Sequence, residues 1–300
     1  MTTTTRPFVS VIVPVFNDAG RLRLCLEALD AQTYPKELYE VVVVDNGSDE
    51  PPARVVARFA RARFSVEPRP GSYAARNRGL ALARGDVFAF TDADCLPAPD
   101  WVERGVAALF ATPNCGFVAG RVEIFFADAR RPTAVELYEG LAALAQKTYV
   151  EAGRFGATAN LFTTRAVVER VGAFDDSVMS GGDVEWGQRV ASRGYAVAYA
   201  DDARVSHPAR RTLAELYRRT ARVVGGFHEL TRAGKCEYIS LGRGLLVDSL
   251  PPVRAALRLL RGRRPERLSD RLKVAAVMFF AQAAQTVELL RLKAGGRPRR

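Results

Sequence analysis

Two apolar runs near the start of the chain predict buried parallel strands. Residues 8–15 are FVSVIVPV and residues 39–45 are YEVVVVD, and continuous β-branched runs of this kind suit strands that are covered on both faces. Between them, residues 21–32 carry apolar side chains at positions 22, 25, 26 and 29, which is the spacing of a helix. This alternation of strand and helix predicts βαβ units and a parallel sheet.

The same kind of pattern continues along the chain and changes character after His207. We therefore expect an α/β domain over residues 1–210, followed by a helical C-terminal region over residues 211–300. In the first part, the pattern predicts helices near residues 52–62, 72–83, 100–110, 133–147 and 183–193, and strands near residues 64–67, 87–91, 116–124 and 158–164. In the second part, residues 213–230, 253–261 and 268–292 have the spacing of amphipathic helices.

Polar residues follow three of the predicted strands: Asn17–Asp18, Asp45–Asn46 and Asp92–Asp94. Right-handed crossovers place the loops after parallel strands along one edge of the sheet, so these residues should gather there. Two carboxylates at positions i and i+2 of a turn, such as Asp92 and Asp94, can face one divalent cation. A cation held there would bridge the phosphates of a nucleotide diphosphate. An isolated Asp-x-Asp is also common as a solvated turn.

Two further features near this edge each have a functional and a structural interpretation. Asp45 could accept a hydrogen bond from a nucleotide base, or it could cap the segment that follows, because Asp is a good N-cap. The segment GSYAARNRG at residues 71–79 opens a predicted helix. Arg76 in this segment could reach a phosphate or a base, or it could lie on an exposed basic face.

Composition and charge exclude several classes of protein and point to an anionic partner. The 300 residues are 48% apolar and 26% charged, which excludes a disordered, collagen-like or coiled-coil chain. The net charge is +11, and it is concentrated at one end: residues 204–300 contain 22 Lys or Arg against 7 Asp or Glu. A basic region of this kind suits membrane lipid or nucleic acid.

The cysteines and the start of the chain favour the cytosol. None of the four cysteines lies in a CxxC pair, so neither a zinc site nor a disulfide framework is expected. The apolar run at residues 8–16 is short, contains Pro14 and lacks a small-residue cleavage site, so we interpret it as a strand and not as a signal peptide. The cysteines are Cys25, Cys95, Cys115 and Cys236.

An ordered set of segments carries a family resemblance. In the first third of the chain these are VSVIVPVFND at 9–18, VVVVDNGSD at 41–49, ARNRGLALARG at 75–85 and FTDAD at 90–94; later come ATANLFTTR at 157–165, VGAFD at 171–175, GGDVEWGQR at 181–189 and VSH at 205–207. Together they resemble the family 2 inverting glycosyltransferases of GT-A fold. The resemblance implies a Rossmann-like, mostly parallel sheet flanked by helices. It also implies a nucleotide-binding half at about residues 8–95 and an acceptor or sugar half at about 96–210.

The resemblance implies a site for a nucleotide diphosphate sugar as the donor substrate. Asp45 would bind the base, Asp92 would contact the ribose or phosphate side, and Asp94 would ligate Mg²⁺ or Mn²⁺. His207 is a further candidate metal ligand, although an isolated histidine is often structural. The other expected donor contacts are Pro14, Phe16, Asn17, Arg76 and Ala93.

The resemblance also implies a catalytic base. The family usually has a Glu-Asp pair at its acidic motif, and here Gly182 stands in place of the Glu. The candidate catalytic carboxylates are therefore Asp183 and Glu185. We expect Asp183 to take the proton from an acceptor hydroxyl in a single in-line displacement; the alternative is an N-cap of the helix over 184–193. Gly181 and Gly182 are expected to let the backbone approach a bound sugar.

Together with these residues, the resemblance implies a metal-dependent, inverting and non-processive glycosyltransferase. The donor would be a UDP-, GDP- or dTDP-sugar, and the acceptor a hydroxyl of a glycan or lipid-linked saccharide. One alternative is a non-catalytic nucleotide-sugar-binding or scaffold protein of the same fold. Another is a sugar nucleotidyltransferase, which the lack of a Gly-rich basic loop after the first strand disfavours.

The basic helical region predicts a membrane surface as partner, at the cytoplasmic face of the plasma membrane. Arg254, Arg258 and Arg261 form one basic stripe, and we expect the helices to bind anionic lipid without spanning the bilayer. The alternatives are packing on the catalytic body or pairing in a homodimer. Nucleic acid is not expected, because no aromatic residues are interleaved for base stacking, and residues 295–300 are expected to be disordered. The predicted apolar face is Leu272, Ala276, Phe279, Ala283, Val287 and Leu290.

Overall fold

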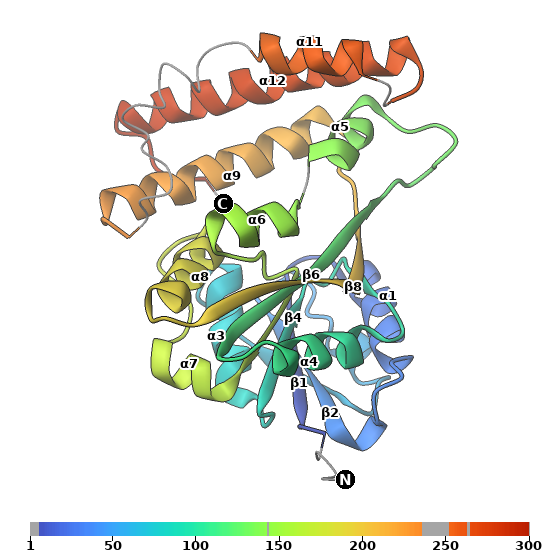
Figure 1. Ribbon diagram of the computed structural model, residues 1–300, viewed down its shortest axis with the longest axis vertical. Coiled ribbons are helices and arrows are strands. Elements are labelled where there is room, and N and C mark those ends of the chain that lie inside the picture. Colours follow the sequence, from blue (N-terminus) through green and yellow to red (C-terminus); the bar gives the residue numbers. More distant parts are fainter. Residues whose placement is uncertain (1–5, 143, 236–251, 263–264, 300) are drawn as a thin grey trace. The chain divides into compact units, whose positions relative to one another are not determined.

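The computed structural model describes residues 6–142, 144–235, 252–262 and 265–299. The chain divides into two compact units (Figure 1). Unit 1 comprises Met1–Glu123, Leu144–Ser177 and Gly182–His207, and unit 2 comprises Ile124–Ala143, Val178–Gly181 and Pro208–Arg300. Cys236 lies outside the described residues.

Unit 1 is built on an eight-stranded sheet in the order β3-β2-β1-β4-β7-β6-β8-β5. The first four strands in this order are parallel, as the apolar runs predict, whereas β7 pairs antiparallel with β4 and with β6. The sheet is therefore parallel where the βαβ pattern is regular and antiparallel beyond it. The strands are β1 (Val9–Val15), β2 (Tyr39–Asp45), β3 (Ala62–Val66), β4 (Val87–Thr91), β5 (Leu96–Pro97), β6 (Cys115–Phe125), β7 (Asn160–Thr164) and β8 (Ala196–Pro208).

Helices cover both faces of the parallel strands. The odd-numbered side chains of β1, from Val9 to Val15, join one core cluster with α1 (Ala19–Asp30) and α4 (Trp101–Ala111). The even-numbered side chains face α3 (Ser72–Leu82), where Val42 and Val44 of β2 pack with Ala75. This coverage on two sides explains why β1 and β2 are continuous apolar runs, and Figure 1 shows α1 and α3 on opposite sides of the strands.

The other helices of unit 1 depart from the sequence predictions in three places. The helix expected over 52–62 is the single turn α2 (Ala53–Val56). The helix expected over 133–147 is two helices, α5 (Ala134–Ala142) in unit 2 and α6 (Gln146–Gly153) in unit 1, with Leu144 between them at φ 51°. The pattern did not predict α7 (Arg165–Val171). The remaining helices of this unit are η1 (Lys36–Leu38), a 3-10 helix, and α8 (Gly182–Ser192).

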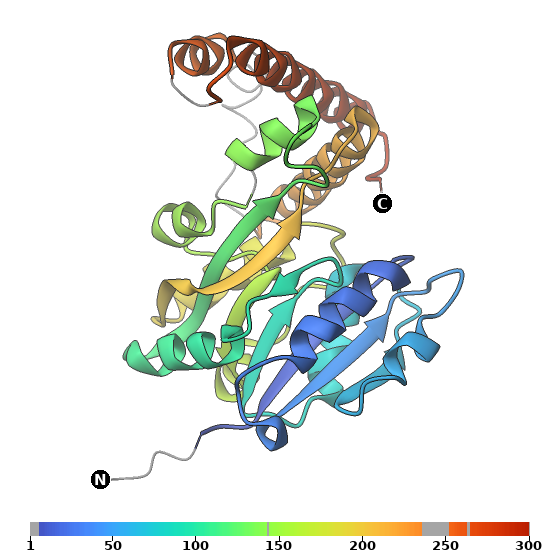
Figure 2. The same ribbon diagram turned by 90° about the vertical axis from the view of Figure 1, so that its right-hand side faces the viewer.

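Unit 2 is helical, as the C-terminal pattern predicts. It contains α5, α9 (Leu213–Arg232), α11 (Val253–Arg261) and α12 (Leu268–Lys293). The long helices α9 and α12 pack along one another, and α12 also packs on α5 and α11 (Figure 2). A capping box at Thr212 and Glu215 starts α9, which satisfies two otherwise unpaired backbone donors at its first turn.

The end of the chain, described through residue 299, contacts α9 and α12; the expected disorder of residues 295–300 stays a prediction. Arg291 donates a hydrogen bond to the Arg297 carbonyl at 2.6 Å, and the Arg299 guanidinium lies 5.6 Å from the Tyr217 ring. Glu288 is fully buried and pairs with both arginines, 291 and 299. Burying this carboxylate would be unfavourable without its two cationic partners, so they fix the terminal segment on α9 and α12.

Candidate active site

The loops after β1 and β2 are joined by hydrogen bonds at the carboxyl edge of the sheet. Asn17, at φ 51°, exchanges hydrogen bonds with Asp49: its amide donates to the carboxylate at 3.0 Å and its carbonyl accepts from the Asp49 N–H at 2.9 Å. Asp45 ends β2, is 1% exposed, and accepts from the N–H and the hydroxyl of Ser48. Asp45 thus closes the turn after β2 at the predicted edge of the sheet, with its carboxylate buried.

The other expected donor residues lie on or next to β1 and β4. Pro14 is buried in β1, opposite Val44 of β2. Phe16, directly after β1, is 57% exposed. Ala93 is buried in the turn between the two aspartates. All of these positions are at the carboxyl ends of parallel strands, where the sequence predicts a ligand site.

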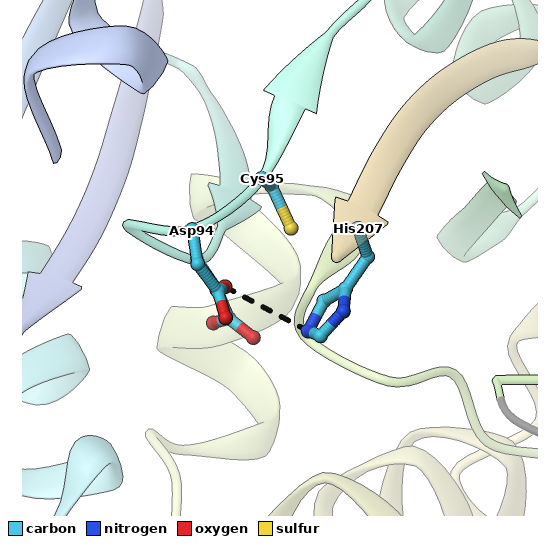
Figure 3. Close-up of side chains that lie close together, drawn as sticks. Asp94, Cys95 and His207 are labelled. Carbon is cyan, nitrogen blue, oxygen red and sulfur yellow. Dashed lines mark ion pairs between the residues drawn. The ribbon is translucent and has the colours of Figure 1, made fainter. Parts of the chain in front are cut away.

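A cluster of four side chains lies after β4, with Asp92, Asp94, Cys95 and His207 contributing atoms that all fall within 4.8 Å of one another. The local cause is a short antiparallel pairing, in which Leu96 of β5 stands opposite Ser206 of β8. This register brings His207 beside the Asp-x-Asp turn. Figure 3 shows Asp94 and His207 facing each other, with Cys95 next to them.

The donor atoms of this cluster suit a hard divalent cation. The His207 Nε2 lies 3.7 Å from the Asp94 Oδ1, too long for a hydrogen bond. It is a spacing that two ligands can have when each is about 2.0–2.6 Å from one ion. Carboxylate oxygens and an imidazole are ligands that Mn²⁺ and Mg²⁺ accept. Burial raises the pKa of Cys95 well above its ordinary value, and a soft sulfur ligand suits these hard cations less well than a carboxylate does.

Electrostatic repulsion in the cluster favours a bound cation. Burial raises the pKa of Asp94, His207 opposes that rise, and the neighbouring Asp92 carboxylate adds to it. A group whose ionised form is disfavoured by burial and by a like charge gains when a positive ion binds. The Asp-x-Asp turn is therefore partly buried, unlike an ordinary solvated turn, and its negative charges favour the binding of a cation.

Arg76 is buried in α3 and forms an ion pair with Asp92. Its side chain is 4% exposed, so the alternative of an exposed basic face is wrong. Its Nε is buried and has no hydrogen-bond partner among the described residues. A buried N–H donor of this kind would be satisfied by an oxygen of a bound ligand.

The two candidate catalytic carboxylates lie in the first turn of α8 and differ in their partners. Glu185 forms a bidentate ion pair with Arg189, whose Nε and Nη2 donate to the two carboxylate oxygens at 2.7 and 2.9 Å. Asp183 accepts from the Tyr73 hydroxyl at 2.9 Å and from the Val184 N–H at 3.0 Å. Because α8 begins at Gly182, Asp183 lies inside the helix and is not its N-cap, which corrects that alternative.

Burial raises the pKa of Asp183, while the Tyr73 hydroxyl and the Arg76 guanidinium lower it. Tyr73 is the contact that sequence reasoning missed. It lies within the GSYAARNRG segment, but no local spacing relates it to a residue 110 positions away.

Comparisons with known proteins show which family the chain belongs to. The family model for glycosyl transferase family 2 matches residues 10–172. The chain belongs to this family. It is 38% identical over 257 residues to the glycosyltransferase AglE of Haloferax volcanii, covering 83% of each chain. It is 30% identical over 223 residues to the pre-mycofactocin glycosyltransferase of Mycobacterium tuberculosis, covering 71% of this chain and 45% of that one.

A solved structure extends the agreement to the fold. The mannosyltransferase PcManGT of Pyrobaculum calidifontis, in complex with GDP-Man and Mn²⁺, superposes with a TM-score of 0.66 and 25% identity. The match covers 97% of this chain and 89% of that one. The predicted GT-A architecture and glycosyltransferase activity are thus confirmed.

Proposed function

We propose that this glycosyltransferase is metal-dependent, inverting and non-processive, and moves a sugar from a nucleotide diphosphate sugar to a hydroxyl acceptor. One observation carries the proposal. Arg76 and Tyr73 lie one turn apart on α3, and they bind Asp92 of the acidic cluster and Asp183 of α8, respectively. A candidate cation site and a candidate base are therefore held by the same helix.

The cation would be held by Asp94 and His207, with Asp92 beside them. A divalent ion there neutralises charge on the diphosphate as it leaves. Asp45, Asn17 and the other residues of the loop edge would contact the nucleotide. The GDP-Man and Mn²⁺ in the structural neighbour make GDP-mannose with Mn²⁺ the first pair to test, with UDP- and dTDP-sugars and Mg²⁺ as the alternatives.

Asp183 would act as the base. As the acceptor oxygen bonds to the anomeric carbon, its proton passes to the Asp183 carboxylate. The bond from that carbon to the phosphate oxygen breaks on the opposite face, and the nucleoside diphosphate leaves with the electron pair. This single displacement inverts the anomeric centre. Glu185 is less suited to the role, because its two oxygens are bound by Arg189.

We further propose that unit 2 binds an anionic membrane surface at the cytoplasmic face of the plasma membrane, near a lipid-linked or glycan acceptor. The predicted apolar face of α12, from Leu272 to Leu290, is exposed, and its opposite face packs within unit 2. By length and composition α12 could also cross a membrane, with 33% of the candidate span buried in the structure. The exposed stripe and the arginines of α11 support surface binding.

The experiment follows transfer directly. Purified full-length protein is incubated with each nucleotide sugar, a lipid-linked or glycan acceptor, and Mn²⁺, Mg²⁺ or EDTA, and the anomeric configuration of the product is read by NMR. An α-linked donor should give a β-linked product only when a divalent cation is present. An α-linked product would contradict inversion, and full transfer in EDTA would contradict metal dependence.

A further inference from the structure

Helix α3 fixes Tyr73 against the start of α8. Tyr73 is 5% exposed, and its ring lies 5.8 Å from the Phe174 ring, measured between centroids. One turn further along α3, the Asn77 side chain donates to the Phe174 carbonyl at 2.8 Å and accepts from its N–H at 3.1 Å. The segment that leads into α8 is therefore tied to α3 at Tyr73 and at Asn77.

Gly182 makes this arrangement possible because it has no side chain. A Cβ at this position would lie 2.9 Å from two atoms of the Tyr73 ring and 3.1 Å from a third. Carbon atoms do not approach so closely, and the ring is held by its neighbours, so any larger residue would displace it. The ring thus fills the space in which a Glu of the usual Glu-Asp pair would begin. The expected approach of a bound sugar to Gly181 and Gly182 stays a prediction, and the contact with Tyr73 is a separate reason for a glycine at position 182.

We propose that Tyr73 is a positioning residue for Asp183, and that Gly182 is needed to leave room for its ring. The proposal rests on the proposed role of Asp183 as the base. Among the described residues, the hydrogen bonds from Tyr73 and Val184 both fall on the Asp183 Oδ1. The Oδ2 is then the oxygen left to receive the proton, in a carboxylate whose rotation is restricted.

The Tyr73 hydroxyl also affects the pH at which Asp183 ionises, because it lowers the pKa of Asp183. Its hydrogen bond favours the carboxylate form, and the Arg76 guanidinium, which lies 5.6 Å from the centre of the Tyr73 ring, acts in the same direction. These two groups on α3 are the titratable and charged groups that oppose the effect of burial on Asp183. Loss of the hydroxyl should therefore shift the protonation of the base to higher pH.

The first test is Tyr73→Phe, which keeps the ring and removes the hydroxyl. We expect kcat to fall about 10- to 100-fold, because misplacing a reacting group has effects of this size, with the donor KM unchanged. The acidic limb of the kcat–pH profile should move to higher pH, which a merely structural role would not cause. The matched control is Tyr199→Phe, which removes another tyrosine–aspartate bond, to Asp201 at 2.8 Å, and should leave kcat unchanged.

The second test is Gly182→Ala, which should lower kcat by displacing the ring. Combined with Tyr73→Phe it should add little further loss, because both changes remove the same hydrogen bond. Gly20→Ala is the control for adding a methyl group to a helix, since nothing lies within 4 Å of a Cβ there. Thermal unfolding of every variant checks folding, and Gly182→Ala provides the test if Tyr73→Phe does not fold.

The outcomes separate this proposal from the proposed function. Wild-type kcat and pH profile in Tyr73→Phe, together with an inactive Asp183→Asn, would overturn the role of Tyr73 and leave Asp183 as the base. Full activity in Asp183→Asn would overturn the base assignment itself. Independent, multiplicative losses in the double variant would overturn the link between Gly182 and Tyr73.

Discussion

Asp94 is a partly buried carboxylate beside the carboxylate of Asp92, and a bound cation would reduce the repulsion between their negative charges. We expect Asp94→Ala to lower Mn²⁺ affinity strongly and to abolish the metal dependence of nucleoside diphosphate binding, because it removes the carboxylate nearest His207. Calorimetric titrations of GDP with and without Mn²⁺ measure both effects. The control is Asp86→Ala. Asp86 is exposed and lies just before β4, the strand that Asp94 follows. Metal-dependent binding that survives in Asp94→Ala would show that the cation lies elsewhere.

Asp183 is the proposed base, and it lies in a buried environment that disfavours its ionised form. Asp183→Asn should keep donor affinity and reduce transfer by several powers of ten, because the amide retains the shape and cannot accept the proton. Initial rates and GDP titrations separate these two effects. In the wild-type enzyme the rate should fall as the pH drops through the pKa of Asp183, which burial holds above its usual value. If Glu185→Gln were inactive and Asp183→Asn active, Glu185 would be the base.

The same substitution predicts a gain in stability. The folded protein binds a proton at Asp183 more tightly than the unfolded chain does, since burial raises the folded-state pKa. The ionised carboxylate therefore destabilises the fold at neutral pH; this penalty begins to shrink as the pH falls through the folded pKa and is gone below the unfolded pKa. Asp183→Asn should unfold at a higher temperature than wild type at pH 7 and lose this advantage in acid. Differential scanning calorimetry at both pH values measures it; a lower midpoint at pH 7 would contradict the expectation.

At single positions, sequence could predict which residues face the site, but only partly what they contact. Asp92, Asp94 and His207 come together as the strand-end argument and the family resemblance predict. The burial of Arg76 and the Tyr73–Asp183 bond could not be predicted. Both depend on where α3 and α8 pack, and this is set by long-range contacts that leave no spacing signal in the chain.

At the scale of elements, strands were easier to predict than breaks between helices. The strands at 9–15, 39–45 and 87–91 are buried on both faces, so their apolar runs mark them clearly. The break between α5 and α6 has no such signal, because LAALAQ consists of good helix formers. There the Gln146 side chain binds backbone groups of Ala157 and Asn160, and this tertiary contact overrides local preference.

The position of α3 on the sheet depends on close contact at Gly79. A Cβ there would lie 2.5 Å from the Ile12 side chain, in the core of β1. Gly79→Ala should destabilise the protein by about 1–3 kcal/mol, the usual effect of overpacking a core, and should also lower activity because α3 carries Tyr73 and Arg76. Urea unfolding and initial rates measure the two effects, with Gly20→Ala as the control. A variant as stable and active as wild type would show that the contact at Gly79 is not needed.

At the scale of the whole molecule, charge is divided unevenly along the chain. Residues 204–300 carry 22 Lys or Arg against 7 Asp or Glu, while the remaining residues carry 22 against 26. Arg254, Arg258 and Arg261 of α11 are all exposed. Each basic residue near an anionic leaflet contributes about 1 kcal/mol to binding. This asymmetry was evident from composition, whereas the exposure of one face of α12 required the structure.

The last prediction joins this charge to the exposed apolar stripe of α12. The full-length protein should co-sediment with vesicles containing phosphatidylglycerol and should bind less in high salt. Dissolved ions screen the attraction between exposed charges that lie farther apart than about 10 Å at 0.1 M salt, and this distance shortens as the salt concentration rises. Phe279→Asp should weaken binding, since Phe279 lies on the stripe and is 41% exposed. Phe110→Asp on α4 of unit 1, which is 62% exposed, is the matched control and should bind as wild type.

Three results would contradict surface binding by unit 2, each for a different reason. Equal pelleting with neutral vesicles in high salt would indicate that α12 inserts into the bilayer, as its length and composition allow. Equal losses in both phenylalanine variants would place the contact outside the stripe. No pelleting with anionic vesicles would leave the stripe to another partner. A second copy of this chain would then be the first to test, because pairing would bury the stripe and leave the arginines in solvent, and ultracentrifugation of Phe279→Asp would detect its loss.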